Sequence, residues 1–178
     1  MIDKNSENDA KFMRLALKEA EKIIGLTSPN PTVGCIIVKK GKIIGRGYHR
    51  KAGGPHAEIE AIRSAKGKPL KGATIYITLE PCSTYGKTPP CVEAIIKSEM
   101  ARVVYGVKDP DFRHQDKAKR LLKKQGIKVT TEILSEDCQR LIRPFAKCVQ
   151  TGLPWVIVKA GMSLDGRLTR PGNEGQWI

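Results

Sequence analysis

Three side chains near the middle of the sequence have the chemistry of metal ligands. His56 offers an imidazole nitrogen, and Cys82 and Cys91 offer two thiolate sulfurs. One nitrogen and two sulfurs are a set that suits zinc, and three protein ligands leave the fourth tetrahedral position open for water, as in catalytic zinc sites. The sequence therefore predicts a Zn²⁺ site formed by these three residues, with a catalytic rather than a structural role.

Glu58 follows the histidine by two residues, close enough to reach a water at the zinc without binding the ion. Zinc lowers the pKa of a bound water to about 7 and so provides a nucleophile at neutral pH. Hydrolysis by such a water also requires a proton to move from the water to the group that leaves the substrate. A carboxylate can carry this proton both ways, so Glu58 is predicted to be the catalytic residue.

Other interpretations of these residues stay open at this point. A structural zinc would need a fourth protein ligand, and Cys35, Cys138 and Cys148 are available, although none is spaced as a ligand pair with the others. Without a metal, the cysteines would be small buried apolar residues. Glu58 would then be an acid that stabilises the N-terminus of a helix. The combination of these four residues, one histidine, one glutamate and two cysteines in this order, favours the catalytic zinc.

Two predicted helices begin at the ligands. Pro55 suits the first position of a helix, which places His56 in its first turn. A strand over residues 73–79 leads into Cys82, and a second helix begins at Cys91. Helix N-termini stabilise anions, so they help to keep thiolates ionised beside a metal.

The remaining apolar pattern alternates between helices and strands. A polar segment at residues 1–8 precedes a first helix, which Asn8 or Asp9 could cap and Gly25 could end. A short turn at Lys40 joins two strands into a hairpin. The expected strands cover 33–38, 43–48, 73–79, 102–107 and 127–133, and the expected helices cover about 9–24, 56–65, 91–99 and 116–125, with a last helix capped by Ser135. This order predicts a three-layer α/β/α fold around a mixed five-stranded sheet.

Composition limits the setting and the partners. The 178 residues suffice for one core of ordinary size, and the net charge of +14 raises the possibility of nucleic-acid binding. The lysines are spread along helices and turns, however, which favours a solvated surface first and a small phosphorylated substrate second. An odd count of five cysteines, no signal peptide and no long apolar run predict a reduced, cytoplasmic protein without a membrane partner.

Four segments together resemble one family of base deaminases. They are SPNPTVG at 28–34, GRGYH at 45–49, PHAE at 55–58 and TLEPCSTYGKTPPC at 78–91. His-x-Glu followed by Pro-Cys and a second cysteine is typical of zinc-dependent base deaminases, which usually separate the two cysteines by two residues. Here residues 83–90 separate them, and this longer loop resembles that of the riboflavin-biosynthesis deaminase, usually the N-terminal half of a bifunctional deaminase/reductase.

The resemblance implies a cytidine-deaminase-like fold and a specific reaction. The substrate would be 2,5-diamino-6-(5-phosphoribosylamino)pyrimidin-4(3H)-one, whose C2 amino group would be hydrolysed to give 5-amino-6-(5-phosphoribosylamino)uracil and ammonia. The resemblance also implies that Asn30 and His49 line the pocket for the base and the ribose phosphate, and that Lys87, with Thr88 beside it, meets the phosphate. An amide can read a polar ring edge, and His or Lys can pair with phosphate.

One segment departs from the pattern of this family. Residues 112–117 (FRHQDK) replace a stretch that is usually small and contains glycine. No substrate contact is therefore carried over to this segment, and His114 is expected at the surface rather than among metal ligands.

The last residues resemble the opening of the family's reductase half, beginning at residue 154. This resemblance divides the chain into a zinc-dependent pyrimidine deaminase domain at 1–150 and a truncated start of a reductase domain at 151–178. A reductase needs an entire nucleotide-binding sheet, so no reductase activity is expected, and NADPH would bind only in a complete reductase domain. The positions that match substrate- or NADPH-facing residues are Lys159, Gly161 and Trp177.

Two other functions compete with this interpretation. A tRNA or other nucleic-acid base deaminase would share the zinc signature and would explain the charge. A non-catalytic scaffold stabilised by zinc would need the ligands alone. The long loop between the cysteines and the reductase-like end favour the small-molecule deaminase, and the presence of Glu58 argues against the scaffold. The expected partners are a small phosphorylated pyrimidine and further copies of the chain in a homo-oligomer, with no nucleic acid and no membrane.

Overall fold

The computed structural model describes residues 4–86 and 89–166, which form five helices and five strands within these ranges. In chain order they are α1 (Lys4–Glu21), β1 (Gly34–Lys39), β2 (Lys42–Tyr48), α2 (Ala57–Ser64), β3 (Thr74–Leu79), α3 (Cys91–Lys97), β4 (Arg102–Val107), α4 (Lys117–Lys124), β5 (Lys128–Thr131) and α5 (Ser135–Thr151). The strands form one sheet in the order β2-β1-β3-β4-β5.

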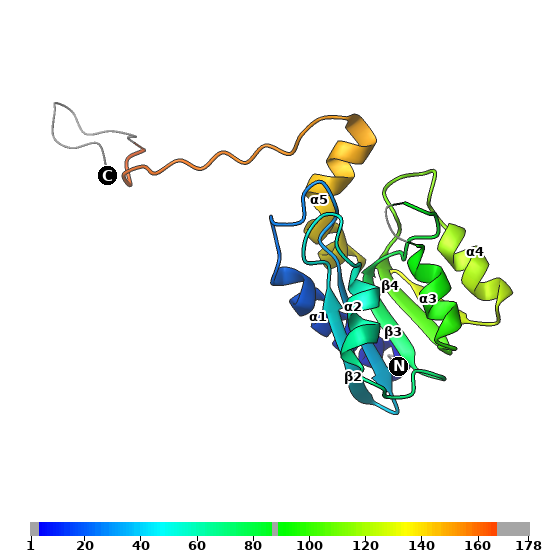
Figure 1. Cartoon of the computed structure of the whole chain (residues 1–178). Helices are drawn as coiled ribbons and strands as arrows, with labels where there is room; N and C mark the ends of the chain where they lie inside the picture. The colour runs from blue at the N-terminus through cyan, green and yellow to red at the C-terminus, as the bar shows by residue number, and fades with distance from the viewer. Residues whose placement is uncertain (1–3, 87–88, 167–178) are drawn as a thin grey trace.

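The sheet is mixed, as the sequence predicted. Strand β1 pairs antiparallel with both β2 and β3, whereas β3, β4 and β5 run parallel to one another. The β1–β2 turn places Lys40 and Gly41 at φ values of 48° and 73°, a left-handed pair that suits a two-residue hairpin. The parallel strands are joined through α3 and α4, which return the chain to the start of the next strand (Figure 1).

Alternating side chains on each strand bury against opposite layers of helix. On β1, Cys35 and Ile37 belong to the core cluster that also contains residues of α2, α3 and α4, whereas Ile36 belongs to the cluster that contains residues of α1 on the other face. Strand β4 repeats the pattern, because Tyr105 belongs to the first cluster and Val104 to the second. The predicted three-layer α/β/α architecture is confirmed (Figure 1).

Helix α1 begins earlier than the sequence predicted. It starts at Lys4 and ends at Glu21, so residues 4–8 of the polar segment expected to precede the helix are part of it, and Ile24 lies beyond its end with 61% of its surface exposed. The predicted capping role of Asn8 or Asp9 is therefore wrong. Asp9 is buried and accepts hydrogen bonds from the Tyr76 hydroxyl at 2.9 Å and from both terminal nitrogens of Arg102 at 2.9 and 2.6 Å.

The other boundaries shift by only a few residues. Strand β5 is four residues long and shorter than expected, and Ser135 is the first residue of α5 rather than its cap. The residue before that helix is Leu134, in a left-handed conformation with φ 53°. Helix α2 begins at Ala57, and His56 is the residue before it. Pro55 therefore lies outside the helix and not at its first position, where the sequence had predicted it.

A glycine allows α2 to lie directly on the sheet. A β-carbon added to Gly47 of β2 would lie 2.3 Å from the backbone carbonyl oxygen of Ala57, the first residue of α2. Helix and strand therefore approach more closely than any larger side chain would permit. This contact fixes the start of α2, and with it the position of His56.

The segment after α5 has no helix or strand up to residue 166, where the description ends. Its apolar residues are exposed, with 70%, 79% and 85% of the surface accessible for Val156, Ile157 and Val158. Figure 1 shows this segment leaving the end of α5 and running away from the sheet. None of the helices that the structure describes has the length and apolar character required to cross a membrane.

The ion pair between Asp9 and Arg102 generates a prediction about stability. Asp9→Ala would leave the partly buried guanidinium and the Tyr76 hydroxyl without their acceptor, so the free energy of unfolding should fall by about 2 kcal/mol. Urea denaturation measures this change. The control is Glu7→Ala, an exposed acid of the same helix, which should change stability by about 0.5 kcal/mol or less. Equal losses for the two variants would contradict the prediction.

Candidate metal centre and active-site cavity

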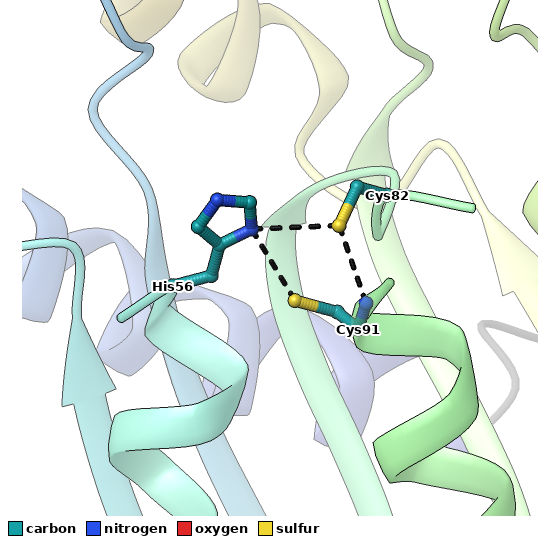
Figure 2. Close-up of side chains that lie close together, drawn as sticks. All are labelled: His56, Cys82 and Cys91. Carbon is teal, nitrogen blue, oxygen red and sulfur yellow. Dashed lines mark hydrogen bonds between the residues drawn. The ribbon is translucent and has the colours of Figure 1, made fainter. Parts of the chain in front are cut away.

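The three predicted ligands come from three different segments that meet at one end of the sheet. His56 immediately precedes α2, Cys91 is the first residue of α3, and Cys82 lies in the loop that leaves β3 (Figure 2). Both helices therefore point their N-terminal ends at the same spot. The partial positive charge of a helix N-terminus favours the thiolate form of a nearby cysteine.

The geometry of the three side chains fits a zinc ion. The Nδ1 atom of His56 lies 3.4 Å from the Cys82 sulfur and 3.3 Å from the Cys91 sulfur (Figure 2). A tetrahedral zinc with ordinary zinc–sulfur and zinc–nitrogen bonds would separate nitrogen from sulfur by about 3.5 Å. In residues 4–86 and 89–166, this is the one cluster of at least three potential ligands whose donor atoms all lie within 4.8 Å of one another.

The electrostatics of the cysteine pair favour a bound cation. The Cys91 thiol and its backbone N–H both point at the Cys82 sulfur, with the N–H at 3.2 Å, and the pKa of Cys82 is lowered to about 4. In turn the Cys82 thiolate raises the pKa of Cys91 well above its usual range. Two sulfurs held this close cannot both be thiolates unless a positive ion lies between them. The pair therefore provides the charge that zinc would neutralise.

Glu58 lies beside this cluster, in the first turn of α2. Its side chain is buried, with 3% exposure, and it lines a cavity together with His56 and Cys82. Burial, followed by the nearby Cys82 thiolate, raises the pKa of Glu58 to about 7. A carboxyl group whose pKa is close to neutral can both accept and return a proton at neutral pH.

Two neighbouring cavities, called here the inner and the outer cavity, share part of their lining at this end of the sheet. The inner cavity, of about 220 Å³, is lined by Glu58, Leu79 and Phe145 among others. The outer cavity, of about 440 Å³, is lined by the glycine-rich turn before α2 and by the first part of the loop between the cysteines. The residues that line both cavities are Asn30, His56, Glu80, Cys82 and Asp109.

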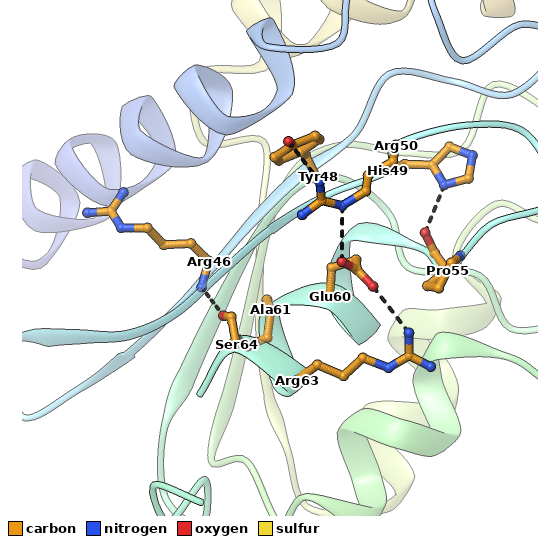
Figure 3. A network of polar contacts seen from close by, with 9 residues as sticks. All are labelled: Arg46, Tyr48, His49, Arg50, Pro55, Glu60, Ala61, Arg63 and Ser64. Carbon is orange, nitrogen blue, oxygen red and sulfur yellow. Dashed lines mark hydrogen bonds and ion pairs between the residues drawn. The ribbon is translucent and has the colours of Figure 1, made fainter. Parts of the chain in front are cut away.

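His49 and Asn30 are linked by hydrogen bonds that fix their orientation. The Nδ1 atom of His49 lies 3.0 Å from the Pro55 carbonyl oxygen (Figure 3), so this nitrogen carries the hydrogen and donates it. The Nε2 atom is then an acceptor, and the Asn30 amide nitrogen donates to it at 3.0 Å. The amide oxygen of Asn30 is thereby left as an acceptor at the boundary of the two cavities. Both predicted residues lie at the cavity, with His49 buried behind Asn30.

The other predicted contacts are placed differently. Lys87, Thr88 and Trp177 lie outside the described residues. Lys159 and Gly161 lie in the exposed segment after α5, and neither lines the two cavities. Their predicted roles stay predictions.

Sequence reasoning missed three residues that face the cavities. Glu80 and Asp109 line both, and His114, which was expected at the surface, lines the outer cavity with its side chain 35% exposed. The position of Glu80 two residues before a ligand was a usable signal. For His114 there was none, because its neighbours in the cavity are remote in sequence.

A three-layer α/β/α domain with a histidine and a cysteine at the starts of two helices, a second cysteine on the loop after β3, and a buried glutamate beside them defines the class of zinc-dependent base deaminases. Comparison with known sequences agrees with this class. Residues 6–107 match the cytidine and deoxycytidylate deaminase zinc-binding region, and the chain belongs to that family.

Proteins named for riboflavin biosynthesis resemble the chain over nearly its whole length. The riboflavin biosynthesis protein RibD of Escherichia coli is 45% identical over 170 residues, which cover 96% of this chain and 46% of that protein. The structure of RibD from Acinetobacter baumannii (form 1) has a TM-score of 0.89 at 43% identity, covering 97% of this chain and 48% of that one. The chain thus spans about half the length of these relatives.

A third relative is named by its reactions. The structure of a diaminohydroxyphosphoribosylaminopyrimidine deaminase/5-amino-6-(5-phosphoribosylamino)uracil reductase from Thermotoga maritima has a TM-score of 0.91 at 39% identity, covering 98% of this chain and 50% of that chain. These similarities agree with the family resemblance and with the predicted cytidine-deaminase-like fold.

The ligand geometry predicts how the protein will hold metal. Purified protein should contain about one zinc per chain, and Cys82→Ala should lose it because two ligands cannot complete the site. Cys148→Ala is the matched control, because Cys148 is an exposed cysteine outside the cluster. Atomic absorption measures the metal content. Full zinc occupancy in a variant lacking both Cys82 and Cys91 would show that the ion binds elsewhere.

Proposed function

We propose that this chain is the deaminase half of a riboflavin-biosynthesis enzyme. The reaction is hydrolysis of the C2 amino group of 2,5-diamino-6-(5-phosphoribosylamino)pyrimidin-4(3H)-one to give 5-amino-6-(5-phosphoribosylamino)uracil and ammonia. The observation that carries the proposal is the cluster of His56, Cys82 and Cys91 with buried Glu58 beside it, where two neighbouring cavities share His56 and Cys82 in their walls. The similarity to proteins named for this reaction over nearly the whole chain supports the choice of substrate.

The shape of the cavities suits a flat base attached to a polar group. The inner cavity is small and lined partly by apolar side chains such as Val33, Leu79 and Phe145, which suit the faces of a pyrimidine ring. The outer cavity is larger and lined by glycines, Ser83 and Thr84, whose small polar groups suit a ribose and a phosphate. The base would then lie next to Glu58, with the phosphoribosyl group directed outward.

The protein groups can carry out each proton transfer that the reaction needs. A zinc ion bound by His56, Cys82 and Cys91 would activate a water for attack on the C2 carbon. Glu58 would take a proton from this water and deliver it to a ring nitrogen as the water oxygen bonds to C2. It would then take the second proton from the new C2 hydroxyl and pass it to the amino group, which leaves as ammonia as the carbon–nitrogen bond breaks and the C2 carbonyl forms. Burial of Glu58 excludes bulk water from these transfers.

Asn30 would hold the ring in register for this attack. Its amide nitrogen is occupied by His49, so its amide oxygen is the atom available to accept a hydrogen bond from a ring N–H or amino group. His49 is itself fixed by the Pro55 carbonyl and acts through Asn30. In this proposal Asn30 contacts the substrate, and His49 sets which end of the amide it presents.

The proposal also covers the division of the chain. Residues 1–150 contain the complete zinc site and its cavities, and residues 151–178 would be the start of a reductase domain. Lys159, Gly161 and Trp177 would contribute to substrate or NADPH binding only when the rest of such a domain is present.

Release of ammonia from the phosphorylated pyrimidine, measured beside a tRNA control, tests the proposed activity directly. Deamination of the tRNA alone would move the protein to the nucleic-acid deaminases.

The role of Glu58 gives a prediction about turnover. Glu58→Gln keeps the size of the side chain but removes its ability to shuttle a proton, so kcat should fall by roughly a hundredfold or more. Zinc content should be unchanged because Glu58 is not among the three ligands. The control is Glu60→Gln, two residues further along the same helix, where the carboxylate pairs with Arg50 and Arg63 (Figure 3) and lines neither cavity. A kcat within a few-fold of wild type for Glu58→Gln would contradict the proton-transfer role.

The predicted phosphate contact of Lys87 separates the two classes of substrate. Lys87→Ala should raise KM for the phosphorylated pyrimidine much more than for its dephosphorylated analogue, because lysine supplies a local point charge. Added salt should weaken binding only modestly, whereas a nucleic acid would be held by many phosphates and show a steep salt dependence. Lys71→Ala is the control, since Lys71 pairs with Glu99 on the surface. Equal changes of kcat/KM for the two compounds would rule out a phosphate contact.

A further inference from the structure

The segment between β4 and α4 forms part of the wall of the outer cavity, and Glu80 holds it at two points. The Oε2 atom of Glu80 accepts a hydrogen bond from the N–H of Asp109 at 3.3 Å and from the N–H of Asp116 at 3.2 Å. Glu80 is 4% exposed and lies two residues before the ligand Cys82. The two ends of residues 109–116 are thus fastened to the segment that carries a zinc ligand.

Hydrogen bonds inside this segment fix its middle. Asp109 accepts from the N–H of Asp111 at 2.9 Å, and Asp111 accepts from the N–H and the Nε of Arg113, both at 2.9 Å. The Arg113 guanidinium holds the pKa of Asp111 at about 2, so this carboxylate is charged at neutral pH. The N–H of His114 donates to the Asp111 carbonyl oxygen at 2.9 Å. The backbone of His114 is therefore held in place by its neighbours.

The imidazole of His114 connects this segment with the loop between the two cysteines. Its Nδ1 atom lies 3.5 Å from the Thr84 hydroxyl oxygen, and its Nε2 atom lies 3.7 Å from the Asp111 carboxylate. Both His114 and Thr84 line the outer cavity. The two side chains therefore meet on the wall of the cavity, at the end away from Glu58, which lines only the inner cavity.

Charge distinguishes His114 from the other groups on this wall. Among the described residues that line the outer cavity, only His56 and His114 have side chains that can become positive, and His56 faces the two sulfurs. The carboxylates of Glu80 and Asp109 also line it, but a carboxylate is an acceptor and does not donate to an anion. An anionic part of a ligand would thus find side-chain hydrogen-bond donors at His114 and Thr84.

We propose that His114 is a specificity-determining residue that contacts the phosphoribosyl end of the substrate, and that Glu80 is the positioning residue that places it there. The inference rests on the proposed function for the identity of the substrate, and it assigns a role to the segment in which this sequence departs from the family pattern. Chemistry at the zinc cluster does not require His114. Its effect falls on substrate binding.

The first test compares two variants of the same segment in the full chain. His114→Ala should raise KM for the phosphorylated pyrimidine roughly tenfold with kcat within about twofold of wild type, as expected for one lost charged hydrogen bond. His114→Lys should recover part of the loss because lysine supplies a hydrogen-bond donor at the same position. Phe112→Ala is the matched control, because Phe112 is 82% exposed and does not line the cavity. An unchanged KM in His114→Ala would overturn the proposal.

A second test examines whether Glu80 acts through His114. Glu80→Gln, which weakens the anchor of the 109–116 segment, should raise KM as well, and the double variant with His114→Ala should be little worse than His114→Ala alone. Zinc content and melting temperature of each variant report any purely structural effect. Full additivity of the two KM changes, or loss of zinc as the sole effect of Glu80→Gln, would overturn the positioning role.

The two proposals fail in different ways. If the wild-type chain does not release ammonia from the phosphorylated pyrimidine, the proposed function is wrong. If the wild type is active and His114→Ala has equal effects on the phosphorylated compound and on the pyrimidine base without its ribosyl phosphate, the function stands and the role of His114 is wrong.

Discussion

The Cys82 and Cys91 sulfurs both lie within 3.4 Å of the His56 Nδ1 atom, and the rest of the site depends on this placement. Two sulfurs and a buried glutamate concentrate negative charge in a region with little solvent, and such an arrangement is costly unless a cation balances it. The starts of α2 and α3 contribute partial positive charge, but zinc is the group that would make the cluster stable in its ionised form. The buried Glu58 is then held where its proton can be exchanged.

The packing of the sheet delivers these groups to one place. Because Gly47 carries no side chain, α2 lies against β2, and His56 is fixed at the start of that helix. Strand β3, in the middle of the sheet, ends at the loop that contains Cys82. The parallel pairing of β3 and β4 then brings the segment after β4 to the same edge. Groups that touch the reacting atoms therefore sit on a rigid scaffold.

Recognition and chemistry are assigned to different parts of the molecule. In the proposed function, His56, Glu58 and Cys91 lie at the starts of two helices and Cys82 on the loop between β3 and α3, whereas Asn30, Thr84 and His114, which would recognise the substrate, all lie on connecting segments. Such segments can change without disturbing the sheet, which is how one scaffold accommodates different substrates. The 109–116 segment is nevertheless well fastened, since Glu80 binds it at two backbone N–H groups. A loop can vary in sequence while its position stays fixed by such an anchor.

The sequence by itself predicted the architecture and placed the candidate zinc ligands. His56, Glu58, Cys82 and Cys91 were identifiable from residue type and spacing, and short runs of apolar residues between turns predicted the strands, because both signals are local. Tertiary structure alone decided that Asp9 pairs with Arg102, 93 positions away, instead of capping α1, and that His49 acts on Asn30. It also decided that His114 reaches Thr84 on the cavity wall. Each of these depends on which side chains the fold brings together, and local propensity holds no information about partners so distant in the chain.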